Sequence, residues 1–194
     1  MNPNLQKAID HLKRTTELHP IPGRIELENG RIWIQPTKDS WGAIFYFAFL
    51  IVAPVLYLAF LLYHDKAEEH GFWILIFIGL SAYYFIKMVS SDRALIVTFS
   101  SEIQLETRNT TPILGYLLPT TRLPIEQIAR VKLEDKSIGL RGRKVVWKEL
   151  WVVDYQNKAF VLTCFEEDSN SARVAQSVKQ LIEQMMMVHQ KKKR

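Results

Sequence analysis

The first feature of the chain is a pair of long stretches that carry almost no charge. Residues 41–63 contain no Asp, Glu, Lys, Arg or His, and residues 71–90 contain only Lys87. As a helix the first stretch is about 34 Å long, and the hydrocarbon core of a bilayer is about 30 Å thick. The second stretch is long enough if Lys87 extends its side chain to the headgroups. The pattern predicts a transmembrane helical hairpin at residues 41–63 and 71–90.

The seven residues between the two spans, 64–70, predict how the hairpin is oriented. A link this short joins neighbouring antiparallel helices, so both flanking segments lie on the same side. The link carries one Lys, whereas both flanks carry several basic residues: Arg24, Arg31 and Lys38 before the hairpin, and Lys87, Arg93 and Arg108 at its end and beyond. The positive-inside rule therefore predicts a multi-pass protein of the inner (plasma) membrane with both termini in the cytoplasm.

Residues 1–40, before the hairpin, show two different periodicities. Apolar residues recur at helical spacing between residues 4 and 18, which predicts an amphipathic helix. Residues 24–35 alternate between polar and apolar on both sides of Asn29-Gly30, a strong signal for a β-hairpin. Because an isolated hairpin is marginally stable in water, we expect this one to pack against another part of the protein.

Residues 91–190, after the hairpin, predict a string of strands followed by a helix. Strands are expected at residues 94–99, 103–108, 144–155 and 159–165, the last two flanking a turn at residues 156–158. In residues 144–155 one face carries Val145, Trp147, Trp151, Val153 and Tyr155, and the other carries Lys144, Lys148 and Asp154. This alternation is typical of antiparallel strands with one buried side.

The last predicted helix has an apolar stripe that includes Val174, Val178, Leu181, Ile182, Met185 and Val188, and Asp168, Ser169 or Ser171 can cap its start. A short basic tail follows at residues 191–194. The fold class that we predict is therefore an α+β membrane protein: a transmembrane hairpin plus an antiparallel β domain closed by a C-terminal amphipathic helix.

The order of these parts resembles the bacterial membrane-anchored proteins with a pleckstrin-homology-like domain. The resemblance covers residues 41–190 and includes the segment Arg122-Leu-Pro-Ile-Glu-Gln-Ile128 between the strands. It implies a binding module without catalytic residues. The N-terminal helix and β-hairpin are not part of the family's pattern.

Catalytic and metal-binding motifs are absent from the sequence. There is no phosphate loop, no Gly-x-Ser-x-Gly, no His-Glu-x-x-His and no Cys-x-x-Cys, and no histidine falls in the predicted strands. The link at residues 64–70 holds five potential metal ligands, but their spacing matches no known site and a polar turn explains them better. The single cysteine, Cys164, lies in an apolar run and is expected in the core. We predict no enzymatic activity, no metal and no cofactor.

Basic clusters are the candidate binding residues. Arg141, Arg143, Lys144 and Lys148 lie at a predicted strand–strand turn and form a candidate site for a lipid headgroup or a partner, although a solvated basic turn is the simpler interpretation. A second set is expected at the membrane surface: Lys87, Arg93, Lys191, Lys192, Lys193 and Arg194. An anionic inner leaflet explains the net charge of +5, so nucleic-acid binding is not expected.

Three functions are compatible with these features. The preferred hypothesis is a non-enzymatic, membrane-anchored binding or scaffold protein whose cytoplasmic domain recruits or regulates a partner. The first alternative is a structural subunit of an oligomeric membrane complex or channel, and the second is a sensor of anionic lipid. The expected partners are the lipid bilayer and either another protein or further copies of this chain.

Overall fold

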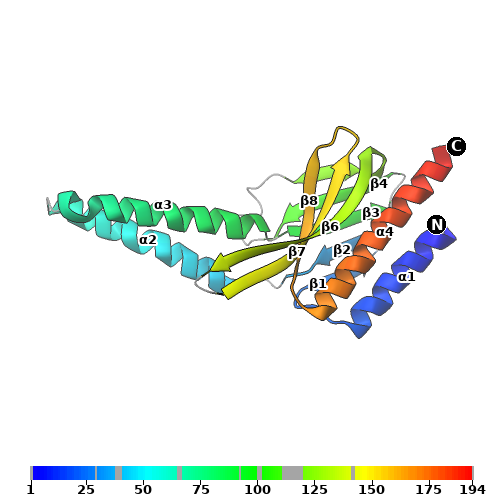
Figure 1. Cartoon of the computed structure of the whole chain (residues 1–194), viewed down its shortest axis with the longest axis horizontal. Coiled ribbons are helices and arrows are strands. Elements are labelled where there is room, and N and C mark those ends of the chain that lie inside the picture. The colour runs from blue at the N-terminus through cyan, green and yellow to red at the C-terminus, as the bar shows by residue number, and fades with distance from the viewer. Residues whose placement is uncertain are drawn as a thin grey trace. The chain divides into compact units, whose positions relative to one another are not determined.

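The computed structural model describes residues 2–28, 30–37, 41–64, 67–91, 93–99, 102–110, 120–140 and 143–193. Within these ranges the side chains of some residues are left out of the description: 41–44, 46, 47, 67–70, 84–91, 138–140, 143–145, 192 and 193. The chain divides into two compact units (Figure 1). The first, called here the α+β domain, combines Met1–Lys38 with Asp92–Arg194, and the second is the helical hairpin Asp39–Ser91.

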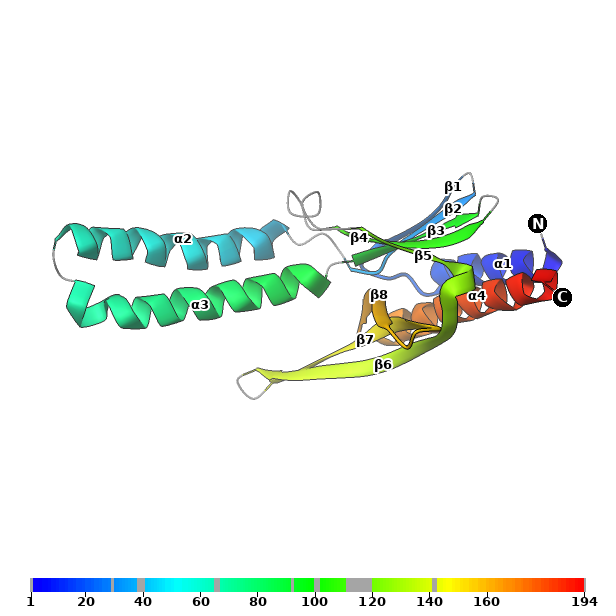
Figure 2. The same cartoon turned by 90° about the horizontal axis from the view of Figure 1, so that it is seen from above.

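The first sheet of the α+β domain has five antiparallel strands in the order β1-β2-β3-β4-β5. Their bounds are β1 Arg24–Glu28, β2 Arg31–Gln35, β3 Arg93–Phe99, β4 Ile103–Asn109 and β5 Thr121–Pro124. The β1–β2 hairpin is confirmed, and Gly30 adopts a φ of 79° at its turn. Strand β2 pairs with β3, so the N-terminal hairpin extends the sheet that the later strands form (Figure 2).

The second sheet has three antiparallel strands in the order β6-β7-β8. A short 3-10 helix, η2 Ile125–Gln127, leads from β5 into β6 Ile128–Leu140, which pairs with β7 Arg143–Asp154; β8 is Ala159–Glu166. In the turn before β8, Asn157 has a φ of 62°, and Asp154 accepts hydrogen bonds from the backbone N–H groups of Gln156 and Lys158. Asparagine tolerates this left-handed conformation, and the aspartate ties the turn together.

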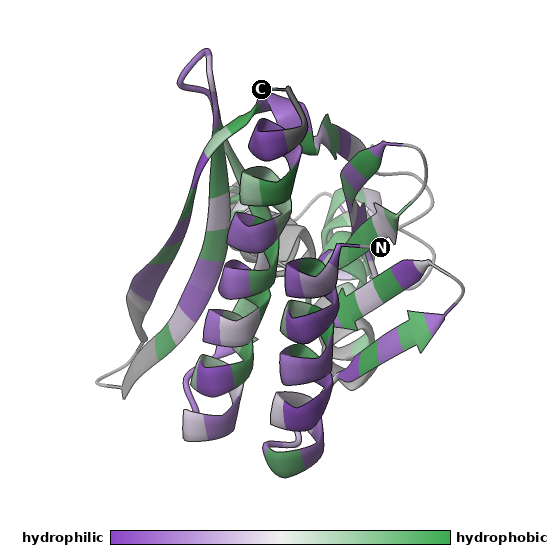
Figure 3. Cartoon of the chain, turned by 90° about the vertical axis from the view of Figure 1, so that its right-hand side faces the viewer, coloured by the Kyte–Doolittle hydropathy of each residue, from purple (hydrophilic) through white to green (hydrophobic). Residues whose placement is uncertain are grey.

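Two helices, α1 Pro3–Leu18 and α4 Ser169–Lys193, lie side by side and antiparallel along the domain (Figure 3). The Asn2 side chain accepts a hydrogen bond from the backbone N–H of Asn4, and Asp168 accepts from the N–H groups of Asn170 and Ser171, each at 2.8 Å. Among the predicted caps of the last helix, Asp168 is therefore the residue that caps it. Both predicted amphipathic helices are confirmed.

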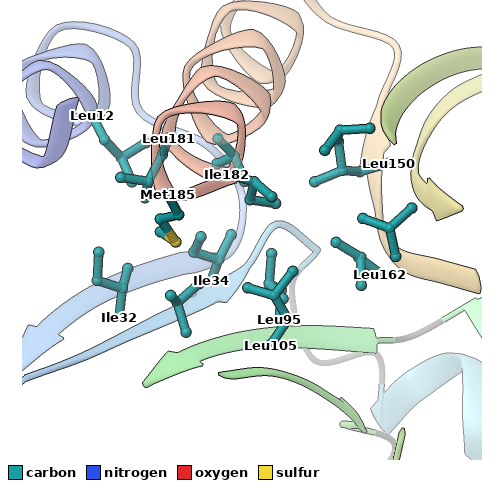
Figure 4. Close-up of a cluster of buried hydrophobic side chains, with 14 of the residues drawn as sticks. Leu12, Ile32, Ile34, Leu95, Leu105, Leu150, Leu162, Leu181, Ile182 and Met185 are labelled. Atoms are coloured by element: carbon teal, nitrogen blue, oxygen red, sulfur yellow. The ribbon is translucent and has the colours of Figure 1, made fainter. Parts of the chain in front are cut away.

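The core of the domain lies between the sheets and the two helices (Figure 4). Leu12 of α1 and Leu181 and Met185 of α4 are fully buried, together with Leu95 of β3 and Leu162 of β8. Every residue of the predicted α4 stripe from Val174 to Met185 is fully buried. On β7 the core face carries Leu150 and Val152, so the buried side of this strand is the one that also holds Lys148 and Asp154.

The helical hairpin consists of α2 Trp41–Tyr63 and α3 Ala67–Ser91, which pack against each other. Both predicted segments are thus helical. Among the side chains that the structure describes in this hairpin, many large apolar ones are exposed, including Phe45, Phe49, Phe72 and Trp73 at 67–68%.

The membrane predictions need correction. In the part of the chain that the structure describes, no helix is both long and apolar enough to cross a bilayer. This finding contradicts the transmembrane hairpin at 41–63 and 71–90, and with it the predicted multi-pass location in the inner membrane. The α+β class with antiparallel sheets remains.

Candidate binding surface

Of the predicted basic turn, the structure describes the side chain of Lys148 alone. Arg141 lies outside the described residues, and Arg143 and Lys144 begin β7 in the stretch whose side chains are not described. Lys148 forms an ion pair with Asp135 on the neighbouring strand β6. The one predicted side chain that can be placed is therefore already neutralised by a cross-strand partner.

Of the predicted membrane-surface cations, the structure describes the side chains of Arg93 and Lys191. Arg93 is half-buried, and its Nη1 donates to the carbonyl oxygen of Val161 at 3.3 Å, which links β3 to β8. Lys87 belongs to α3 of the hairpin, and its side chain is not described. Lys191 is exposed on α4; Lys192 and Lys193 follow in the helix without described side chains, and Arg194 lies beyond the described residues.

What the structure does bring together is a row of side chains on the outer face of β7. Trp147, Glu149 and Trp151 alternate with core residues, so they share the side of the sheet that faces away from the core. The Nε1 of Trp147 donates to Oε1 of Glu149 at 2.7 Å, and the Nε1 of Trp151 donates to Oε2 of the same carboxylate at 3.0 Å. One carboxylate thus fixes the orientation of two indole rings.

Strand β6 places three charged residues opposite this row. Lys132, Glu134 and Lys136 pair with Trp151, Glu149 and Trp147 respectively. The ammonium of Lys136 lies 2.8 Å from a carboxylate oxygen of Glu134 and 5.6 Å from the centre of the Trp151 ring. Two glutamates directly across a ladder would repel each other, and the neighbouring lysine offsets that repulsion.

The electrostatics of these residues follow from the same contacts. The hydrogen bond from Lys136 lowers the pKa of Glu134 below its ordinary value, and the hydrogen bond to Glu134 raises the pKa of Lys136. Both groups therefore stay charged at neutral pH. With Lys132, Lys136, Glu134 and Glu149, the surface carries equal numbers of positive and negative charges.

We call Trp147, Glu149, Trp151 and Lys136 the tryptophan platform. Both indole N–H groups are used internally, and both oxygens of Glu149 accept a hydrogen bond. The platform therefore offers ring faces and flanking charges to a ligand, and its carboxylate is engaged where a general base would have to be free. The arrangement suits binding better than catalysis.

A second polar feature joins α1 to α4. A groove of about 540 Å³ is lined by side chains of both helices: Asn4, Lys7, Ala8, His11, Ser177, Gln180 and Gln184. The Ser177 hydroxyl lies 3.2 Å from that of Thr15 and 3.5 Å from Nε2 of His11, and His19 contacts Asn170 and Arg173 at 3.2 and 3.3 Å. These contacts give the two histidines a structural role in holding the helices together.

Metal ligands do not converge in the part of the chain that the structure describes. The side chains of residues 65–70, which include most of the potential ligands in the link between α2 and α3, lie outside that part. Cys164 is buried, as its apolar surroundings in the sequence indicate.

Comparison with family models, with curated proteins and with solved structures gives no match to this chain. The resemblance to pleckstrin-homology-like domains therefore stays a prediction. Sequence reasoning missed the platform, although Trp147-Lys-Glu-Leu-Trp151 contains a signal for it. Residues at positions i, i+2 and i+4 of a strand share a face, so the glutamate necessarily lies between the two tryptophans.

Proposed function

We propose that this chain is a non-enzymatic binding or scaffold protein whose α+β domain recruits a protein partner through the tryptophan platform. The observation that carries the proposal is the pair of half-buried indoles locked by Glu149 on the outer face of the second sheet. Tryptophan is among the residues most enriched in the energetic centres of protein interfaces. Rings that are already held in place lose little conformational entropy when a partner binds.

The mixed charges around the rings favour a protein segment over a nucleic acid or an anionic surface. Lys132 and Lys136 are balanced by Glu134 and Glu149, so the platform provides no net positive field that a phosphate-rich partner requires. Alternating charges next to an aromatic centre are typical of the polar rim of a protein–protein interface.

The test compares proximity labelling in cells by the unaltered chain and by the variant carrying Trp147→Ala and Trp151→Ala. We expect a defined set of labelled proteins to fall at least tenfold with the double variant. The matched control is Tyr155→Ala, which removes an aromatic ring that is 65% exposed just beyond β7 and outside the platform. Equal labelling by all three proteins, with unchanged unfolding temperatures, contradicts the proposal.

Glu149→Gln provides a finer test of the same idea. The amide oxygen can still accept a hydrogen bond from one indole N–H. The amide nitrogen is a donor, so it cannot accept from the second indole N–H. We expect partial loss of labelling and a red-shifted or broadened tryptophan emission that reports the freed ring. Loss of labelling equal to that of the double variant would point to direct contact by the carboxylate.

A second candidate function is a structural subunit of an oligomeric complex. The observation that favours it is the large apolar surface of the helical hairpin, because exposed apolar patches of this kind mark interaction sites. The two functions use different units of the chain and are compatible with each other.

A further inference from the structure

The apolar surface of the hairpin is larger than one ordinary interface. Sixteen large apolar or aromatic side chains of α2 and α3 are at least 39% exposed: Phe45, Phe49, Val52, Val55, Leu56, Tyr57, Phe60, Leu62, Tyr63, Phe72, Trp73, Leu75, Ile76, Phe77, Leu80 and Tyr83. An aromatic side chain has a surface of about 150–250 Å². At their exposed fractions, the sixteen side chains together expose roughly 1,800 Å². A standard interface takes about 800 Å² from each partner.

The exposed positions also spread around α2. At 100° per residue, the exposed side chains from Phe45 to Tyr63 cover an arc of about 220°. The apolar stripe by which a helix packs on one neighbour is roughly 100° wide. One neighbour therefore covers less than half of the exposed arc.

The shape of the surface indicates what covers it. Ala53, Pro54 and Tyr57 of α2 and Trp73, Ile74 and Phe77 of α3 line an apolar hollow of about 460 Å³. Gly79 of α3 is also open to a neighbour, since a Cβ there would meet no described atom within 4 Å. Elsewhere on the same hairpin, Phe45, Phe49 and Phe72 protrude with two thirds of their surface exposed. The hairpin thus carries both a hollow and rings of a kind that can fill it.

A second copy of the hairpin is the occupant that matches these features. Its α2 helix has the same length and the same uncharged surface, because residues 41–63 contain no Asp, Glu, Lys, Arg or His. Two copies could fill hollow and rings reciprocally about a two-fold axis, but that single neighbour would leave more than half of the exposed arc of α2 uncovered. A heterologous contact, which gives each copy two neighbours, therefore fits the surface better. Heterologous contacts leave each copy with one hollow and one ring patch to be filled by further copies, and they close only as rings.

We propose that the hairpins of at least three copies of this chain form a closed bundle in which a protruding phenylalanine of each copy enters the Ala53–Phe77 hollow of the next. This inference rests on the second candidate function and names its partner and its symmetry. Each hairpin then contacts two neighbours, which matches an exposed area of about twice that of one interface.

The test is the mass of the full chain, purified in a mild detergent and measured by native mass spectrometry across a range of protein concentrations. We expect a complex of three or more chains. Ala53→Trp fills the hollow and should shift the midpoint of dissociation at least tenfold toward monomers. Leu27→Trp adds the same side chain on strand β1 of the α+β domain and should leave the mass unchanged.

A chain that is monomeric with its hairpin covered by detergent or lipid alone overturns the proposal, and so does a mass that stops at two copies. A ring that persists with Ala53→Trp contradicts the assigned hollow. If Ala53→Trp lowers the helix content, the variant with Phe45→Ala and Phe49→Ala replaces it as the test, since it removes rings without adding bulk. It should likewise shift the complex toward monomers. The variant with Trp147→Ala and Trp151→Ala should form a complex of the same number of chains as the unaltered protein. The experiment therefore distinguishes failure of the bundle from failure of the recruitment function.

Discussion

Truncation of Leu12 tests whether α1 is part of the core of the α+β domain. Leu12 is fully buried and points toward Leu181 and Met185 of α4, which lie about 170 positions further along the chain (Figure 4). Removing a buried leucine side chain to alanine costs about 3 kcal/mol, the sum of lost burial and the cavity left behind. In a domain of this size each kcal/mol lowers the unfolding temperature by about 4 °C, so Leu12→Ala should lower it by about 12 °C.

The control is the same substitution in the same helix. Leu18 is 75% exposed, so Leu18→Ala should change the free energy of unfolding by less than about 0.5 kcal/mol. Hydrogen exchange followed by mass spectrometry gives the measurement, because it reports α4 and the strands separately from the hairpin. Loss of protection in α1 alone, with α4 unaffected by Leu12→Ala, would refute the reasoning that the two helices share one core.

Three further predictions concern the backbone and its caps. Gly23→Ala should destabilise the domain by about 3 kcal/mol in chemical denaturation, because the added Cβ would lie 1.8 Å from the carbonyl oxygen of Gln35; an unchanged denaturation midpoint would contradict this close approach. Burial tends to raise the pKa of Asp168, but hydrogen bonds from Ser171 and Asn170 outweigh it and lower the pKa below its ordinary value, so this residue stabilises the fold above the unfolded pKa and the contribution is lost as pH falls through the folded pKa. Asp168→Ala should therefore cost about 1 kcal/mol at pH 7 and much less in acid, and a cost independent of pH would contradict the assignment. Thr163→Val should cost about 1 kcal/mol in thermal unfolding, since it removes the hydrogen bond that the buried hydroxyl donates to the carbonyl oxygen of Arg93 at 2.6 Å; an unchanged unfolding temperature would contradict this role of the hydroxyl.

Local patterns in the sequence predicted most helices and strands, but they could not predict which distant strands pair. Alternation at residues 94–108 and 144–165 and the Asn29-Gly30 turn each depend on neighbours a few positions apart, and the structure has strands there. The pairing of Ile34 with Leu95 joins residues on either side of the helical hairpin, and no local period encodes it. The uncharged stretches predicted two helices correctly, but the membrane crossing inferred from them is contradicted.

The candidate surface likewise depends on long-range contacts that local patterns do not predict. The face of β7 that looks outward could not be read from the strand alone, because both of its faces carry apolar residues: Trp147 and Trp151 on one, Leu150 and Val152 on the other. The ion pair of Lys148, one of the four predicted basic residues, was missed for a related reason. Lys148 is neutralised by Asp135, and that contact depends on the register of β6 against β7, which the sequence does not reveal.

The antiparallel pairing of α1 with α4 has a consequence for how the chain folds during synthesis. His19 and Asn170, which touch across the two helices, are 151 positions apart. At a translation rate of about 5–20 residues per second, α1 exists for roughly 8–30 seconds before its partner helix is made. Throughout that time Leu5 and Leu12 have no α4 to cover them. Ile32 and Ile34 of β2 cannot pair with β3 until the helical hairpin has been synthesised. The N-terminal segment therefore remains incompletely packed until the rest of the α+β domain has been synthesised.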